Sequence, residues 1–262
     1  KQVTTSSPYN NVMGSIGGTL FSFGGGSNTT VYYSPEHAAL TNKSSWQNVV
    51  LPHPGMGITD FVLDPMHNRV LVGVGFTDYW VPGDSYIYSV NPQGGVKQLW
   101  KGLERPWDMA VDDQGSVLIA AWDGGLNRLN LAEDESLIFD GRIDQSSFEF
   151  PDELNSRSGG AYNIALGLDG KYYCRFWFPE MPEILQQNAI MTSEDRGSSW
   201  KEYTIVSSPT QIYVHPSGDV FATDSVYGIA KLVGSNYLPS NSGIQKVSVN
   251  LIYKDPLTPS RV

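Results

Sequence analysis

The chain has 262 residues and a formal net charge of −10, and only 17% of its residues are charged. The acid excess argues against nucleic acid and anionic membranes as partners, and no apolar run approaches the roughly 18 residues that a membrane span needs. Glycine (27) and tyrosine (14) are abundant, whereas long patterns of Ala, Leu, Glu and Lys are missing. This composition predicts many short strands joined by tight turns.

Five segments along the chain share one pattern, in which a polar residue precedes an alternating apolar strand, a turn rich in Asp, Asn or Gly, and a second apolar strand. The turns have the residue types of β-hairpins. We expect four of the second strands to contain Val70, Leu118, Tyr172 and Phe221. In chain order, the segments begin at Asn11, Thr59, Trp107, Tyr162 and Thr210.

Two more predicted strands follow each hairpin, so each repeat holds four antiparallel strands at a period of about 48 residues. This pattern predicts an all-β fold, a β-propeller with five blades in a single domain over residues 1–262. A sixth blade stays open, and a β-sandwich is the less favoured alternative because sandwiches rarely repeat internally. Residues 244–253 are one candidate for the outer strand of the last unit, and the alternative is that the first five residues or the C-terminal tail close the ring. The predicted units span about 10–52, 56–103, 105–143, 159–206 and 209–253.

Two stretches and one residue stand apart from the repeat. Residues 148–160 form the longest irregular stretch and are expected to be a loop over one face, and residues 180–187 a short helical turn. Cys174 is the single cysteine, which rules out an internal disulfide, and its apolar neighbours predict a small core residue.

The chain carries weak signs of export. Its first residue is Lys1 rather than Met, as expected for a processed or trimmed chain. Asn28 and Asn42 each begin a triplet of the N-glycosylation pattern. We therefore expect a secreted or cell-surface protein.

One short motif has a recognisable spacing, Ser-x-Asp-x-Gly-x-x-Trp, formed by Ser193, Asp195, Gly197 and Trp200. It resembles the Asp-box, or BNR repeat, of sialidase-like and sortilin-like propellers. The resemblance implies a structural turn between third and fourth strands, on the face opposite the ligand site. There Asp195 would accept turn amides, Gly197 would adopt a positive φ, and Trp200 would pack between sheets.

A degenerate counterpart of this motif lies in the first unit, where Ser34 is followed by an insertion and then by Trp46 in the place of Trp200. The catalytic site of the sialidases that this motif resembles combines three arginines, a Tyr–Glu pair and an Asp. No such arginine set can be placed in this sequence, so the motif indicates scaffold rather than an active site.

A second likeness covers residues 105–125, which are similar to gluconolactonase-like and NHL-type propellers. Those lactonases place an Asp metal ligand directly after a proline. In this sequence Trp107 holds that position, and Asp108 comes one place later. The departure weakens the prediction of a lactonase-type metal site.

Each repeat also places one polar side chain near the opening of its inner strand. Because inner strands line the centre of a propeller, these side chains are expected to form a ring at its mouth. They would either cap strands and face solvent, or bind a ligand, a water cluster or a hard cation; Asp60, Asp108 and Asn163 offer oxygen ligands that suit Ca²⁺. The ring residues are Asn11, Asp60, Asp108, Asn163 and Gln211.

Aromatic residues are expected at the same level as the ring, because loops after second strands lie on the face where inner strands begin. Taken singly, each of these aromatic residues is more often a packing residue between blades than a ligand contact. As a group beside Asp and Asn, their flat faces suit sugar rings, whose C–H faces stack while hydroxyls find polar partners. The aromatic candidates are Trp80, Trp107, Trp122, Tyr162 and Trp177.

These features favour a non-catalytic extracellular or surface propeller that binds carbohydrate or a protein partner, either alone or as part of a larger assembly. The alternative is a hydrolase, either a glycoside hydrolase with Asp60 and Asp108 as its acid–base pair or a metal-dependent lactonase. Fold alone separates none of these functions.

Overall fold

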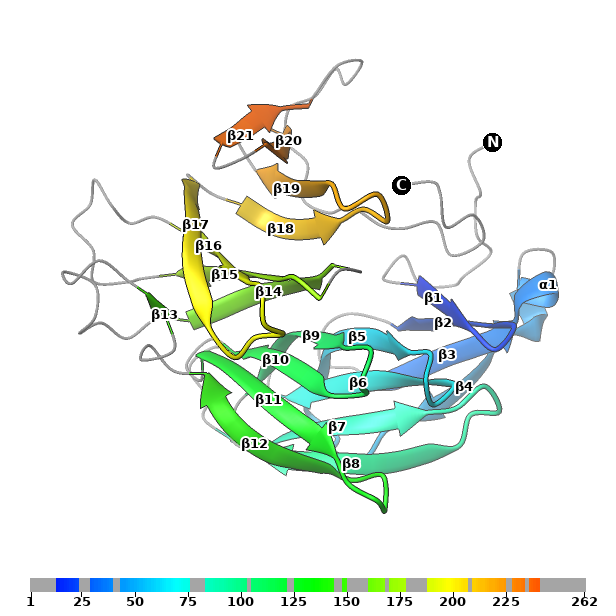
Figure 1. Cartoon of the computed structure of the whole chain (residues 1–262). Coiled ribbons are helices and arrows are strands. Elements are labelled where there is room, and N and C mark those ends of the chain that lie inside the picture. The colour runs from blue at the N-terminus through cyan, green and yellow to red at the C-terminus, as the bar shows by residue number, and fades with distance from the viewer. Residues whose placement is uncertain are drawn as a thin grey trace. The chain divides into compact units, whose positions relative to one another are not determined.

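Almost every described element is a β-strand (Figure 1). In the described part, the helical elements are a short α-helix, α1 (Glu36–Ala39), and one 3-10 turn, Lys43–Ser45. Neither is long or apolar enough to cross a membrane. The computed structural model describes residues 13–23, 29–39, 43–75, 83–102, 105–121, 125–143, 148–149, 160–167, 170–177, 188–206, 209–224, 228–233 and 236–240.

The first of two compact units comprises Lys1–Val117 and Leu129–Phe139. It contains two complete four-stranded antiparallel sheets, each paired in chain order. Such meanders arise when short turns return every strand beside its predecessor. The strands are β1 (Met13–Ile16), β2 (Thr19–Phe23), β3 (Thr30–Pro35), β4 (Gln47–Val50), β5 (Gly57–Asp64), β6 (Arg69–Gly75), β7 (Ser85–Val90) and β8 (Val96–Gly102).

A third sheet, β9 to β12, has residues assigned to each unit, with β9 in the first. The second unit, Leu118–Arg128 and Asp140–Val262, holds two complete sheets. The strands are β9 (Pro106–Val111), β10 (Val117–Ala121), β11 (Gly125–Leu131), β12 (Leu137–Ile143), β13 (Phe148–Glu149), β14 (Gly160–Leu166), β15 (Tyr172–Trp177), β16 (Asn188–Ser193), β17 (Trp200–Val206), β18 (Pro209–Val214), β19 (Val220–Asp224), β20 (Gly228–Val233) and β21 (Asn236–Pro239).

One turn type recurs between strands. In each case a backbone N–H bonds to the carbonyl four residues later, and the residue before that carbonyl has a positive φ. Glycine suits that residue because it lacks the Cβ that disfavours the left-handed region. The turns begin at Asn91, Asp112, Ala132, Gly167 and His215.

Apolar side chains from facing sheets form the core of each unit. In the first unit, Phe21 and Val31 pack with Phe61, Val72 and other buried residues of the β5–β8 sheet. In the second unit, side chains of β15 and β16 pack against those of β18, β19 and β20. Each fully buried large apolar side chain contributes about 1.5–3 kcal/mol to folding. Cys174 is fully buried, as predicted.

The predicted all-β architecture of repeated four-stranded antiparallel sheets is confirmed, with one such sheet in each predicted unit. Val70, Leu118, Tyr172 and Phe221 all lie on second strands. Alternation of apolar residues and hairpin turn chemistry were enough to place them.

One predicted detail is wrong, and two others lie outside the described residues. The fourth described strand of the last sheet is β21 at Asn236–Pro239, whereas 244–253 lies outside the described residues. The stretch 148–160 is not wholly irregular, because Phe148–Glu149 pairs in parallel with the edge of β17. This pairing extends that sheet to five strands. The predicted helical turn at 180–187 lies outside the described residues.

Candidate functional site

The predicted polar residues lie within inner strands, a few residues after each strand begins. Asp60 is on β5, Asp108 on β9, Asn163 on β14 and Gln211 on β18, whereas Asn11 lies outside the described residues. Three of these strands have a bulge directly before the polar residue. A bulge bends the strand and re-aims its side chains. The residues skipped in the pairing are Thr59, Tyr162 and Thr210.

Two of the polar side chains connect neighbouring inner strands. The carboxylate of Asp60 on β5 accepts the backbone N–H of Met109 on β9 at 2.6 Å. The side-chain oxygen of Asn163 on β14 accepts the backbone N–H of Ile212 on β18, also at 2.6 Å. Each donor lies 49 residues after its acceptor. The same contact is therefore repeated in both units, and neither interpretation of the ring anticipated it.

The two connections differ in charge. Burial raises the pKa of Asp60 to about 7, although hydrogen bonds from the amides of Phe61 and Met109 act in the opposite direction. The Asp60 side chain keeps part of its surface exposed, so it can exchange a proton with solvent near neutral pH. Asn163, at the equivalent position, makes its contact without a titratable group.

Two arginine side chains lie over aromatic rings beside these contacts. The guanidinium of Arg175 lies 4.7 Å from the ring centre of Tyr162, and that of Arg105 lies 5.5 Å from the ring of Trp107. All four side chains are partly exposed. Arg175 faces Asn163 across the β14–β15 ladder, and burial lowers the pKa of its guanidinium.

The other predicted aromatic residues cannot be placed as side chains. Trp80 and Trp122 lie outside the described residues, and Trp177 is described only through its backbone, as the last residue of β15. Among the described residues, no group of three or more His, Cys, Asp or Glu lies close enough together to hold a metal ion.

The Ser193–Trp200 segment forms a dense turn between β16 and β17, the third and fourth strands of their sheet. The Ser193 hydroxyl donates to Asp195 at 2.8 Å and accepts the Gly197 amide at 2.7 Å. Asp195 also accepts the amide and hydroxyl of Ser199 at 2.8 and 2.6 Å. The fully buried Trp200 donates its indole N–H to the Gly197 carbonyl at 3.1 Å.

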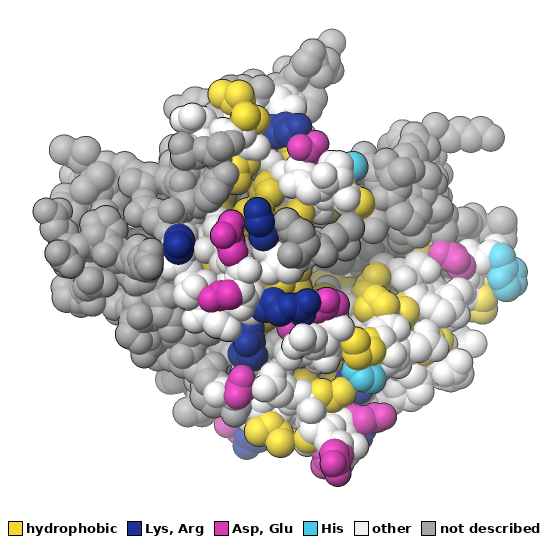
Figure 2. Space-filling model, viewed as in Figure 1, with side chains coloured by type: hydrophobic (Ala, Val, Ile, Leu, Met, Phe, Trp, Pro, Cys, Tyr) yellow, Lys and Arg dark blue, Asp and Glu magenta, His cyan; other side chains and the backbone are white. Residues whose placement is uncertain are grey.

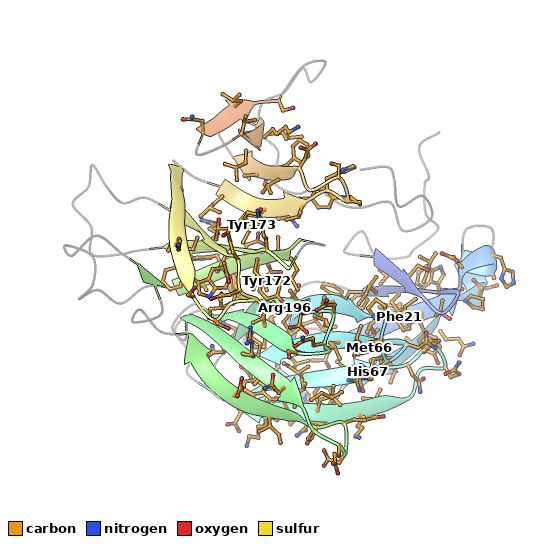
Figure 3. The ribbon with its side chains drawn as sticks, viewed as in Figure 1. Phe21, Met66, His67, Tyr172, Tyr173 and Arg196 are labelled. Carbon is orange, nitrogen blue, oxygen red and sulfur yellow. The ribbon has the colours of Figure 1, made fainter. Side chains whose placement is uncertain are left out.

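Electrostatics and a neighbouring strand hold this turn in place. Burial alone would raise the pKa of Asp195, but hydrogen bonds from Ser199 and Ser193 lower it overall. From β11, Arg128 donates to the Arg196 carbonyl within the turn. Tyr172 and Arg196 lie beside each other there (Figure 3), and the Tyr172 ring borders Gly197.

The first-unit counterpart is related in position but simpler. Ser34 is fully buried at the end of β3, as Ser193 is at the end of β16, and its hydroxyl hydrogen-bonds with that of Ser45 at 2.7 Å. The indole nitrogen of Trp46 is buried and has no acceptor among the described residues. The helical insertion between β3 and β4 therefore replaces the tight turn.

The sequence interpretation missed four participants: the amides of Met109 and Ile212, and the side chains of Arg105 and Arg175. The sequence held a signal for the two amides, because Met109 directly follows the ring residue Asp108 and Ile212 directly follows the ring residue Gln211. Arg175 could have been found by pairing the strands around the turn that begins at Gly167, which sets it opposite Asn163.

Comparisons with known proteins give the fold. No protein-family model matches the chain, and no curated protein matches it. Among solved structures, YCF48 bound to D1 peptide matches with a TM-score of 0.55 and 12% identity over 95% of this chain and 74% of that one. The Dos1 propeller matches at 0.56 and 10% identity over 89% of this chain and 62% of the Dos1 chain.

A third match is regucalcin, a calcium-binding protein from Agrobacterium tumefaciens, at a TM-score of 0.52 and 13% identity over 82% of this chain and 68% of that one. At such low identities the matches carry the fold and no particular activity. The chain is an all-β protein with the β-propeller fold, built from four-stranded antiparallel sheets.

Proposed function

We propose that the chain is a non-catalytic binding propeller that recognises a protein partner through the ends of its sheets where the inner strands begin. The observation that carries this proposal is that a guanidinium lies over an aromatic ring in each unit, Arg105 over Trp107 in the first and Arg175 over Tyr162 in the second. A ring face covered by a guanidinium is closed to the C–H face of a sugar. Arginine, tyrosine and tryptophan are instead the residue types that dominate binding energy at protein interfaces.

The strand contacts of Asp60 and Asn163 support the same proposal. Each ties a bulged inner strand to the next one, which fixes the backbone next to the arginine–aromatic pairs. A surface that is rigid before binding loses less conformational entropy when a partner docks. The similarity to YCF48, whose solved structure holds a D1 peptide, agrees with a peptide-binding role for this fold.

We also infer that Ser193–Trp200 is an Asp-box that acts as scaffold. Hydrogen bonds of Ser193 and Asp195 lie within the turn, and Arg128 of β11 donates to the Arg196 carbonyl, which supports a scaffold role. The proposal keeps the expected single domain and the secreted or cell-surface location, for which Asn28 and Asn42 are the sequence motive.

A hydrolase is the second candidate, and one observation favours it. A carboxyl group with a pKa near 7, as at Asp60, is suited to exchange protons in general acid–base catalysis. In that case Asp60→Asn would abolish turnover of aryl glycosides or lactones while binding persists. In a binding module, the same substitution keeps the Met109 contact and leaves function intact.

The proposal is tested by probing a peptide-display library and a glycan array with the intact chain, Trp107→Ala and Met66→Ala. Met66 is an exposed control, 55% accessible, in the turn at the opposite end of β5. We expect selected peptides to bind the intact chain and Met66→Ala but not Trp107→Ala. Glycan binding that Trp107→Ala loses would favour the carbohydrate alternative and contradict a protein partner.

A further inference from the structure

The turn between β5 and β6 holds a histidine whose ring is oriented by a buried carboxylate. Asp64, the last residue of β5, is 1% exposed. His67 Nδ1 lies 3.0 Å from its Oδ1 and 2.8 Å from its Oδ2, and Arg69 Nε donates to Oδ2 at 2.8 Å. A carboxylate accepts hydrogen bonds and donates none, so Nδ1 of His67 carries the ring proton and Nε2 keeps its lone pair.

The other ring nitrogen of His67 is open to a ligand. Among the described residues, the polar contacts of His67 run through its amide and its Nδ1 atom, all to Asp64. Its side chain is 23% exposed, and Nε2 is not one of the buried atoms without a partner. An imidazole whose Nδ1–H is held by a carboxylate is the arrangement in which proteins present Nε2 to a metal ion.

A thioether lies beside this ring. Met66 directly precedes His67 and is 55% exposed. Both side chains border Gly115 of the β9–β10 turn, where an added Cβ would lie 3.2 Å from His67 Cε1 and 3.4 Å from Met66 Sδ. The two residues lie next to each other in Figure 3, and Figure 2 shows a histidine beside a hydrophobic side chain at this place on the described surface. All of these residues belong to the first unit.

A nitrogen and a thioether sulfur suit a soft cation. Thioether ligands select Cu⁺ among the biological metals, and imidazole also binds copper. Ca²⁺ needs about 6–8 oxygen ligands. In the described part of the chain, no group of three or more His, Cys, Asp or Glu could supply a larger coordination sphere. The pair therefore fits an ion that accepts a low coordination number, as Cu⁺ and its analogue Ag⁺ do.

We propose that His67 Nε2 and Met66 Sδ form a surface site for a soft monovalent cation, Cu⁺ or Ag⁺, with Asp64 as the residue that positions the imidazole. Both ligands are neutral, and the nearby Asp64 carboxylate makes the imidazole a more basic ligand. The net charge of −10 also favours the approach of a cation. The inference goes beyond the proposed function, because the site lies at the far end of β5 and needs no protein partner.

The test titrates Ag⁺ into the full chain by calorimetry, and Cu⁺ under anaerobic conditions in competition with a chromogenic chelator. The variants are His67→Gln and Met66→Leu. His37→Gln, in an exposed histidine of α1, is the matched control. Cys174→Ala controls for the single thiol of the chain, which is fully buried. Circular dichroism confirms that each variant is folded.

We expect the intact chain to bind a single ion tightly. His67→Gln and Met66→Leu should each weaken that binding at least about tenfold, because even an outer-shell partner of a metal ligand contributes about 10–100-fold in affinity. His37→Gln and Cys174→Ala should bind as the intact chain does. Nitrogen-15 NMR of the intact chain should show His67 with its proton on Nδ1, and Ag⁺ should shift the Nε2 signal together with the Met66 methyl signal.

Several results would overturn the inference. One is that no ion binds, or that binding persists in both His67→Gln and Met66→Leu. Another is that binding disappears in Cys174→Ala, which would place the ion at the thiol. A His67 ring with its proton on Nε2 would show that Asp64 does not orient the imidazole for a metal.

Discussion

The Asp60 carboxylate accepts the amide N–H of Met109 at 2.6 Å, and this contact joins the inner strands of two successive repeats. β5 and β9 run side by side in the first unit (Figure 1). Asn163 makes the same contact with Ile212 in the second unit. Asp60, which the sequence marks as a candidate binding residue, therefore also connects two strands of the fold.

Removing the acceptor at residue 60 should destabilise the fold. Asp60→Asn keeps a side-chain oxygen, as Asn163 does naturally, whereas Asp60→Ala leaves the buried Met109 amide unsatisfied. We expect Asp60→Ala to be less stable than Asp60→Asn by about 1–3 kcal/mol in urea unfolding. Equal stabilities would mean that the contact is dispensable.

The raised pKa of Asp60 predicts a specific pH dependence. The folded state holds this proton up to about pH 7, whereas the unfolded chain releases it near 3.8, so the folded state binds more protons between these values. The free energy of unfolding of the intact chain should therefore fall relative to Asp60→Asn as pH rises through this window, then level off. Unfolding both proteins across the window measures the difference, and a flat difference would refute the assignment.

Asp195→Ala should cost stability without affecting ligand binding. Its carboxylate accepts the Ser199 amide and hydroxyl and the Ser193 hydroxyl, and unmet turn donors cost about 1–3 kcal/mol. Glu194→Ala, in the exposed neighbouring residue, is the matched control. An unchanged melting temperature together with lost peptide binding would instead place function at this turn.

Gly197 and Gly218 allow the cost of a left-handed backbone to be separated from a steric clash. Both have a similar positive φ, 84° and 87°. A Cβ at Gly218 would meet nothing within 4 Å, whereas one at Gly197 would lie 3.1 Å from the Arg128 guanidinium and 3.4 Å from Trp200. Gly218→Ala should cost about 1 kcal/mol, and Gly197→Ala clearly more. Thermal unfolding compares the stabilities of the two variants. Equal costs would show that the Arg128 side chain moves aside without a loss of stability.

Local chemistry in the sequence accounts for most of the described fold. Alternating apolar residues and Asp- or Gly-containing turns place the strands of Val70, Leu118, Tyr172 and Phe221. The strand β21 was missed for a physical reason, because edge strands bury few side chains and their apolar pattern is therefore weak. Asn236–Pro239 is short and mixed in polarity.

The candidate site was less accessible from sequence because its contacts are tertiary. The acceptors Asp60 and Asn163 were found from their spacing, but their donors are backbone amides that carry no residue signature. The Tyr162–Arg175 stack depends on a bulge at a residue other than glycine, which no turn motif announces. A comparison of the spacing from one repeat to the next, rather than within each repeat, would have pointed to the Met109 and Ile212 amides.

The central claim is that a protein segment docks beside Trp107, where the inner strand β9 begins. Hydroxyl-radical footprinting of the full chain, with and without a peptide selected from the display library, measures this directly because Trp, Tyr and Met side chains all react. The account predicts that the peptide protects Trp107 and leaves the exposed Met66 as reactive as before. Unchanged oxidation of Trp107 in the saturated complex would contradict it.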